Sequence, residues 1–194
     1  YDADNAFGAG FPNNGTVNVN AAVVMNGGKW ETGSINNNNT LTLTNAAATP
    51  TDYGTVANYD TLNMDGGAFT DLTNAEGGNV YLNANYTLTD IINWVNSGIV
   101  YNNAELKLQD AKTLGNFFNY KTVVLDVDYT TFGTGFTNAA DGSLVQVTAE
   151  HSVTMDAGTW TKGSIENSGT LTLTNGGINY GVISNSGALN MNGG

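Results

Sequence analysis

Apolar and polar residues alternate along this chain in short runs. In "TLTLTN", which occurs at Thr40–Asn45 and again at Thr170–Asn175, every second residue of the first four is leucine. A period of two is typical of a β-strand with one buried face, because successive side chains point to opposite sides. We therefore expect the leucines to point inward and the threonines to face solvent. "KTVVLDV" and "DGSLVQV" in the middle of the chain predict strands of the same kind.

Two long segments of the chain repeat each other. "MNGGKWETGSINNNNTLTLTN" from Met25 matches "MDAGTWTKGSIENSGTLTLTN" from Met155, 130 positions later. Further along, "YGTVANYDTLNMDGG" from Tyr53 matches "YGVISNSGALNMNGG" from Tyr180. Residues 14–67 thus recur approximately as 141–194, and such self-similarity indicates a repeat architecture.

A shorter period of 18 residues runs inside each copy. Met155, Leu173 and Met191 follow one another at this interval, and so do Asn167 and Asn185. Eighteen residues suit one turn of a solenoid with three short strands, in which equivalent inward residues stack from coil to coil. The sequence therefore predicts an all-β, right-handed parallel β-helix (β-solenoid) of about 18–21 residues per coil and eight to nine coils, with apolar columns and an asparagine amide ladder.

The domain organisation follows from the same repeat. We expect one β-solenoid domain over 1–194, with regular coils at 14–85 and 141–194 and irregular coils at 86–140. An interval of 21 from Leu43 to Met64 predicts a bulge at "AAATP". An antiparallel sandwich or barrel is the competing fold, since it also has frequent short strands. It gives no reason for one residue type to recur every 18 positions, so the solenoid is favoured.

Charge narrows the choice of partners. The chain has 17 acidic residues against five lysines, a formal net charge of −12, and no arginine. Nucleic acids and anionic membrane surfaces are held by clustered lysine and arginine, so we expect neither as a partner. No apolar run is long enough for a spanning helix, which predicts no membrane insertion. There is no cysteine, which excludes disulfides and thiolate chemistry.

The repeats resemble those of a known group of proteins. "NSGTLTLTNGG" from Asn167 and "NSGALNMNGG" from Asn185 are similar to the degenerate repeats of bacterial surface β-helices, namely autotransporter passenger domains and filamentous-haemagglutinin-like adhesins. The resemblance covers about 14–85 and 141–194. It implies a secreted, bacterial repeat protein at the cell surface or in the extracellular space, with an adhesive or structural role.

His151, the single histidine, is the first candidate for chemistry. Glu150 stands beside it and Asp156 lies close in sequence, so His151 is a conceivable catalytic base. Strict alternation places it on the inward side of Val153 and Met155, unless the chain bends there. We interpret it as a partly buried or corner histidine.

Asp126 and Asp128 form the second candidate. On one face of a strand they would lie roughly 7 Å apart, a spacing suited to a hydrated cation or to an acid and base acting on a sugar. The pectin-cleaving β-helices use adjacent acidic pairs, a Gly-His-Gly element, or an arginine or lysine base beside calcium-binding acids. Lys107, Lys112 and Lys121 match no such motif. The sequence therefore nominates no catalytic, cofactor-binding or metal-ligating residue, and we expect no enzyme and no cofactor.

The tryptophans are the third candidate. Trp30 and Trp160 occupy equivalent places in the two copies, which favours packing in the core or at a corner over a sugar-stacking role. Trp94 lies outside the repeat pattern and is the better candidate for a contact residue.

The two ends of the chain complete the prediction. It opens at Tyr1 without methionine, as expected of a processed protein or a piece of a longer one, and "LNMNGG" breaks off inside a coil. We expect end-to-end self-association or continuation of the same rod. The hypothesis is an extracellular structural or adhesive β-solenoid that forms a surface rod or filament, with host or matrix glycans as further partners. The alternative is a carbohydrate-active β-helix: a polysaccharide lyase, a hydrolase or a glycan-binding module.

Overall fold

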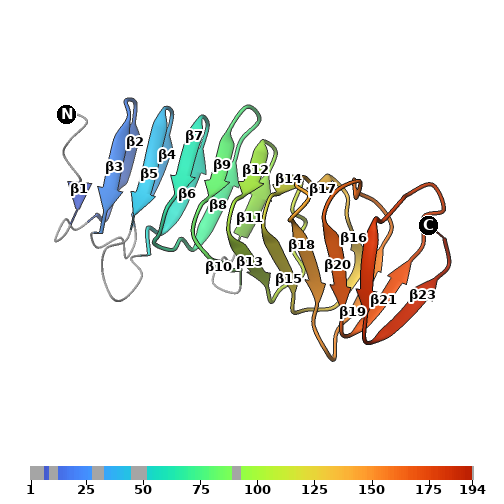
Figure 1. The fold of residues 1–194 in the computed structure, drawn as a ribbon. Coiled ribbons are helices and arrows are strands. Elements are labelled where there is room, and N and C mark those ends of the chain that lie inside the picture. Colours follow the sequence, from blue (N-terminus) through green and yellow to red (C-terminus); the bar gives the residue numbers. More distant parts are fainter. Residues whose placement is uncertain (1–6, 9–12, 28–32, 45–51, 89–92, 194) are drawn as a thin grey trace. The chain divides into compact units, whose positions relative to one another are not determined.

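The computed structural model describes residues 7–8, 13–27, 33–44, 52–88 and 93–193. In these residues the chain forms parallel sheets and no helix, and its coils stack into a β-solenoid of about nine turns, which confirms the predicted fold class (Figure 1). No helix in the described ranges is long and apolar enough to cross a membrane. The chain divides into two compact units, which are described in turn: unit 1 is Tyr1–Ala84 with Asp90–Val100, and unit 2 is Asn85–Thr89 with Tyr101–Gly194.

Unit 1 contains two parallel sheets. One has the order β1-β3-β5-β7-β9 and the other the order β11-β8-β6-β4-β2. Each coil contributes one strand to each sheet. The bounds are β1 Phe7–Gly8, β2 Thr16–Val19, β3 Val23–Asn26, β4 Ser34–Asn37, β5 Thr40–Thr44, β6 Thr55–Asn58, β7 Thr61–Met64, β8 Asp71–Asn74, β9 Asn79–Leu82 and β11 Asn93–Asn96.

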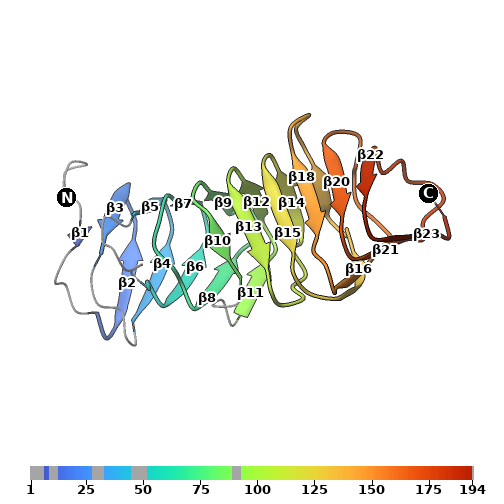
Figure 2. The ribbon, with the colours of Figure 1, turned by 60° about the horizontal axis from the view of Figure 1, so that its bottom comes forward.

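Unit 2 contains the sheet β10-β13-β15-β18-β20-β22, the sheet β16-β19-β21-β23 and the pair β14-β17 (Figure 2). Strand β12, Ile99–Asn102, spans the division between the units. The other bounds are β10 Tyr86–Thr87, β13 Glu105–Leu108, β14 Asn116–Asn119, β15 Thr122–Leu125, β16 Tyr129–Phe132, β17 Phe136–Asn138, β18 Leu144–Val147, β19 Ser152–Met155, β20 Ser164–Asn167, β21 Thr170–Leu173, β22 Val182–Asn185 and β23 Ala188–Met191.

The predicted apolar columns are present in both units. In unit 2, Met155 pairs with Leu173, and Leu173 pairs with Met191. Met155 and Leu173 are at most 1% exposed. In unit 1, Leu43 pairs with Met64 in spite of the longer interval, and both are fully buried. The expected bulge at "AAATP" lies outside the described residues. Burial of these alternating side chains from water is the main force that favours the coil.

Asparagines at the ends of strands form the predicted amide ladder. The Asn167 amide donates to Asn185 Oδ1 at 2.7 Å and to the Ala188 carbonyl at 2.8 Å. Asn37, fully buried in unit 1, donates in the same way to Asn58 Oδ1 at 2.7 Å. Buried amide groups are usually hydrogen-bonded, and these donated bonds tie each of the two coils to the one that follows it. The ladder is not fully paired, since Asn102 Oδ1, Asn138 Nδ2 and Asn167 Oδ1 are buried without a partner.

The same ladder explains why the middle of the chain looks irregular in sequence. In unit 1, Asn74 donates to Asn96 at 2.8 Å. In unit 2, Asn102 donates to Asn119 at 2.9 Å. Only six positions separate Asn96 from Asn102, so two asparagine corners flank the single strand β12. At β12 the asparagine corner therefore moves from the ends of β8 and β11 to the ends of β12 and β14. The pattern shifts along the chain and is not lost.

Glycines at the bends have two separate physical roles. Gly163 and Gly181 have φ of 70° and 71°, a left-handed conformation that favours glycine, as their equivalent places in the repeat predict. Gly169 is required for space, because a Cβ there would lie 2.3 Å from the carbonyl oxygen of His151 in the preceding coil.

Candidate functional site

The site in unit 2 begins with a change in the length of the corners between its two larger sheets. The regular corner between β20 and β21 has two residues, Ser168 and Gly169. The corner between β18 and β19 has four residues, 148–151, and the corner between β15 and β16 has three, 126–128. The extra residues lie outside the strands, where their side chains are free to meet.

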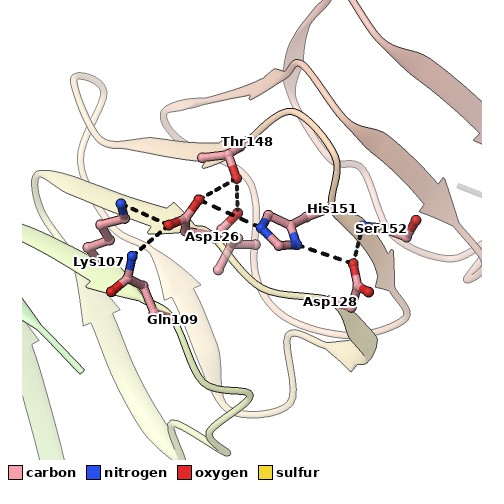
Figure 3. Close-up of polar contacts among 8 residues, drawn as sticks. Lys107, Gln109, Asp126, Asp128, Thr148, His151 and Ser152 are labelled. Atoms are coloured by element: carbon pink, nitrogen blue, oxygen red, sulfur yellow. Dashed lines mark hydrogen bonds and ion pairs between the residues drawn. The ribbon is translucent and has the colours of Figure 1, made fainter. Parts of the chain in front are cut away.

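Asp126 is the centre of the polar contacts at these wider corners (Figure 3). Its Oδ2 lies 2.8 Å from Lys107 Nζ and accepts a hydrogen bond from Gln109 Nε2 at 2.8 Å. Its Oδ1 lies 2.9 Å from the Thr148 hydroxyl. We call Lys107, Gln109, Asp126, Asp128, Thr148 and His151 the corner cluster. It joins three consecutive coils, those of β13, β15 and β18.

His151 lies between the two carboxylates of the corner cluster. Its Nε2 is 3.7 Å from Asp126 Oδ1, and its Nδ1 is 3.4 Å from Asp128 Oδ1. Glu150, immediately before it, has φ of 73° in the left-handed region, and the chain bends there. The bend turns His151 out of the inward column of Val153, so the interpretation as a corner histidine is confirmed.

The contacts of Asp126 determine its charge. Hydrogen bonds from Gln109, Lys107 and Thr148 hold the pKa of the Asp126 carboxyl well below its usual range. The group is therefore ionised at neutral pH and unsuited to act as a general acid. Asp128 is more accessible, with 70% of its side chain exposed, and its Oδ1 accepts a hydrogen bond from the Ser152 amide at 2.7 Å.

The sequence paired some of these residues wrongly. Asp126 and Asp128 do not lie on a strand face, because β15 ends at Leu125. His151 meets these two aspartates and not the sequence neighbours Glu150 and Asp156 that made it a candidate. His151 follows Asp126 and Asp128 by one coil in the sequence. Aligning the two longer coils strand by strand is the signal that brings these three residues together.

A cleft opens beside β16, next to the corner cluster. Three residue steps in β16, from Tyr129 to Phe132, match two steps in β19, from Val153 to Met155, so β16 contains a β-bulge. A cleft of about 510 Å³ lies between β16 and the segment 111–114. Asp128 lines the cleft and also belongs to the corner cluster.

Tyr129 fixes the far wall of this cleft. Its buried hydroxyl accepts a hydrogen bond from the Lys112 amide at 3.0 Å and lies 3.2 Å from the Lys112 carbonyl oxygen. Burial raises the pKa of the Tyr129 hydroxyl to about 12. The neutral phenol therefore holds segment 111–114 in place at all ordinary pH values.

The predicted lysines have different partners. Lys107 contacts Asp126 as described, whereas Lys112 Nζ lies 2.7 Å from Asp110 Oδ2. The pKa of the Asp110 carboxyl is lowered by this hydrogen bond from Lys112. The cleft thus contains one lysine already matched by a carboxylate, together with the exposed carboxylate of Asp128.

The tryptophans fall mostly in the core. Trp160 is 1% exposed and packs on Phe136 with ring centroids 5.0 Å apart, which confirms its predicted packing role. Trp94 is 9% exposed and pairs with Leu72, so its prediction as a contact residue is wrong. Strand β11 turns it inward in the place that Ile35 has in an earlier coil. Trp30 lies outside the described residues.

In the described ranges, no three histidine, aspartate or glutamate side chains are grouped so as to hold a metal ion. Comparison of the chain with protein-family models, curated proteins and solved structures gives no match. The fold by itself defines the class, a β-solenoid repeat protein.

Proposed function

We propose that this chain is an extracellular structural or adhesive β-solenoid. Copies of it stack end to end, or its own coils continue, to form a surface rod or filament. The observation that supports it is the coil of β22 and β23, whose outer side exposes the apolar columns that inner coils bury. Met191 is 64% exposed, whereas its column neighbours Leu173 and Met155 are buried. Ile183 of β22 pairs with the fully buried Ile165 and is itself only half-buried.

The composition of this coil supports stacking as well. Residues 182–193 include no charged side chain. Proteins protect open strand edges with charges, prolines or bulges, because unpaired backbone groups otherwise recruit another strand. The β22–β23 coil has none of these in its strands, and its apolar side chains are in register for a further coil. A second copy of the chain satisfies these groups, and so do further coils of the same polypeptide.

The test is the association state of the purified 194-residue chain. We expect sedimentation velocity to show concentration-dependent association and negative-stain images to show filaments. The double variant Ile183→Lys/Met191→Lys places two charges on the exposed ends of the apolar columns and is expected to abolish association. Thr172→Lys, on the outward face of β21, is the matched control and leaves it intact. A wild-type chain that stays monomeric at millimolar concentration contradicts end-to-end stacking.

A secreted or cell-surface location, and the likeness to autotransporter and haemagglutinin-like repeats, belong to this proposal. The repeat motif at Asn167 and Asn185 and the absence of cysteine support them. Detection of the chain on intact cells by a membrane-impermeant label is the corresponding test, and labelling seen only after lysis contradicts the location.

The second candidate function is a carbohydrate-active β-helix, and the cleft beside β16 is the observation that favours it. A groove with Asp126, Asp128 and a lysine is the arrangement that this function requires. The cleft contains Asp128 and Lys112, while Asp126 lies in the corner cluster and is not part of its lining. Binding of a sugar is therefore better supported than its cleavage.

A further inference from the structure

We infer that the cleft beside β16 is a binding site for a neutral saccharide. Its volume of about 510 Å³ falls within the range of small-molecule sites in proteins. It is formed by Ala111–Leu114 on one side, by Asp128–Thr134 on the other, and by Phe136. The inference names a ligand for the adhesive part of the proposed function, and it does not depend on end-to-end stacking.

The bulge in β16 supplies the polar wall. Strict alternation along "YTTF" places Tyr129 and Thr131 on one face and Thr130 and Phe132 on the other. The structure instead buries both aromatic residues and exposes both threonines. Two consecutive hydroxyls therefore face outward at the cleft, and Thr113 and Thr134 are exposed at its other edges. Hydroxyls that both donate and accept hydrogen bonds suit the hydroxyls of a sugar.

Apolar side chains line the inner part of the cleft. Leu114, Phe132 and Phe136 are at most 4% exposed and belong to its lining. The rings of Phe132 and Phe136 pack with centroids 5.1 Å apart. An apolar interior with a few placed polar groups is typical of small-molecule sites. A sugar ring has an apolar face of C–H groups and a rim of hydroxyls, and so matches both parts of the cleft.

The walls of the cleft are held in place before any ligand binds. The Tyr129 hydroxyl anchors the backbone of Lys112, as described above. At the other end Gly133 has φ of 125°, and a Cβ there would lie 2.2 Å from the Ala157 carbonyl oxygen. Preformed walls reduce the ordering entropy that binding must overcome.

Charge selects a neutral ligand. Lys112, the cation of the cleft lining, is matched by Asp110 at 2.7 Å, and Asp128 adds a carboxylate. The whole chain has a formal net charge of −12. A uronic acid or phosphorylated sugar would be repelled on both counts. The Asp128 carboxylate, by contrast, accepts hydrogen bonds from neutral hydroxyls.

An extended peptide is a poorer match for the same place. β16 is the edge strand of its sheet, and strand addition needs a regular row of backbone donors and acceptors. The bulge between Tyr129 and Phe132 breaks that row. Bulges are one means by which proteins block pairing at an edge.

The test uses the ¹⁵N-labelled 194-residue chain and a panel of tetrasaccharides. Cellotetraose, xylotetraose, mannotetraose and maltotetraose are the neutral probes, and tetragalacturonate is the anionic one. We expect at least one neutral probe to shift amide resonances of 111–114 and 128–136 in a saturable way at concentrations up to about 10 mM. Tetragalacturonate is expected to bind at least about tenfold more weakly, because of the carboxylate repulsion.

Matched variants decide whether the hydroxyl wall is responsible. Thr130→Val/Thr131→Val keeps shape and removes two exposed hydroxyls, and is expected to weaken binding about tenfold or more. Thr170→Val/Thr172→Val removes two outward hydroxyls from β21, in the same sheet but outside the cleft, and is expected to bind as the wild type does. The inference is overturned if no neutral probe shifts these amides, if tetragalacturonate binds equally well, or if the Thr130/Thr131 variant keeps full affinity.

Failure of this inference is distinguishable from failure of the stacking proposal. Association is measured without a saccharide and responds to Ile183 and Met191. Saccharide binding is measured by the resonances of the cleft and responds to Thr130 and Thr131. Each result therefore supports or overturns one proposal alone.

Discussion

Unit 2 has two kinds of corner, which differ in length and in the side chains that link them to neighbouring coils. Narrow corners have two residues and follow a buried asparagine, as after Asn119 and Asn167. Wide corners have three or four residues and follow an apolar residue, Leu125 or Val147. Narrow corners are linked from inside by amides. The wide corners are linked from outside by Asp126 and its ionic and polar partners.

The difference shows how a repetitive scaffold acquires a local site. Along the column of Val123, Val145, Ile165 and Ile183 the coil interval shortens from 22 to 20 to 18 residues. The inward residues stay in register throughout, so the added residues project outward at corners and bulges. Asp126, Asp128, Thr148, His151 and strand β16 lie in the longer coils, and the coil before them, where Leu106 and Val123 are 17 residues apart, contributes Lys107, Gln109 and segment 111–114. Core stacking thus constrains the strands and leaves the connections free to carry function.

The largest expected effect is on a narrow corner. Asn119→Ala removes an amide that donates to Asn138 Oδ1 at 3.0 Å and to the Leu144 carbonyl at 3.1 Å, and that accepts from Asn102. Leaving these buried groups unpaired is expected to lower the free energy of unfolding by about 3 kcal/mol in urea titrations. Asn185→Ala, at an exposed position, is the control, expected to cost less than about 1 kcal/mol. Equal losses would mean that burial of the ladder is unimportant.

The next largest effect on stability is expected where a narrow corner contacts the wide corner of the preceding coil. In Gly169→Ala the new Cβ would lie 2.3 Å from the His151 carbonyl oxygen and 2.4 Å from that of Thr148. Backbone must move, so we expect a loss of about 2 kcal/mol in the same assay. Gly142→Ala has open space around its Cβ and is expected to stay within about 0.5 kcal/mol of the wild type. A neutral Gly169→Ala would show that the stacked corners have room to separate.

A smaller effect is expected at the wall of the cleft. Tyr129→Phe removes the hydroxyl that accepts from the Lys112 amide, which is expected to cost about 1.5 kcal/mol and to speed hydrogen exchange at Lys112. Because the pKa of Tyr129 is raised to about 12, its contribution is complete below pH about 10 and is lost as pH rises toward about 12. The variant should therefore lose less stability than the wild type over this alkaline range. Unchanged exchange at Lys112 would contradict the anchoring role.

The smallest effect is expected at the wide corners, because their contacts are partly exposed. Asp126→Asn is expected to lower stability by about 1 kcal/mol at neutral pH. The pKa of Asp126 is lowered in the folded chain, so its contribution is present above pH about 4 and is lost as pH falls further. The variant should show a shallower loss of stability in acid. Asp65→Asn, a carboxylate of unit 1 that accepts from Asn83, is the control for a generic change of charge. An acid slope as steep as that of the wild type would contradict the role of Asp126.

Much of the fold was predictable because its signals are local and periodic. Met155, Leu173 and Met191 stack as their interval indicates, and Asn167 bonds to Asn185. The site was less predictable. Asp126 and His151 were separate candidates, and nothing in their own surroundings in sequence pairs them. Predicting their contact requires the lengths of two successive coils, and coil length varies in this part of the chain.

The cleft was not predictable from the alternation of residues. The run "YTTF" has the same polar and apolar composition whether it alternates or bulges, and the bulge appears only when β16 is paired with β19. Trp94 shows the same limit, since pairing with Leu72 turns it inward. Aromatic residues outside a repeat are placed by their neighbours across the sheet, and not by their own position in the chain.

The sequence by itself determined that the chain is a parallel solenoid, which residues of the regular coils face inward, and that asparagines link coils at Asn167 and Asn185. These features follow from spacing, and spacing is a property of the sequence alone. Only the tertiary structure decided which corners meet, that His151 lies between Asp126 and Asp128, and that a cleft opens beside β16. Those outcomes depend on how coils of unequal length come into register, because added residues must bulge toward solvent wherever the stacked core leaves them room.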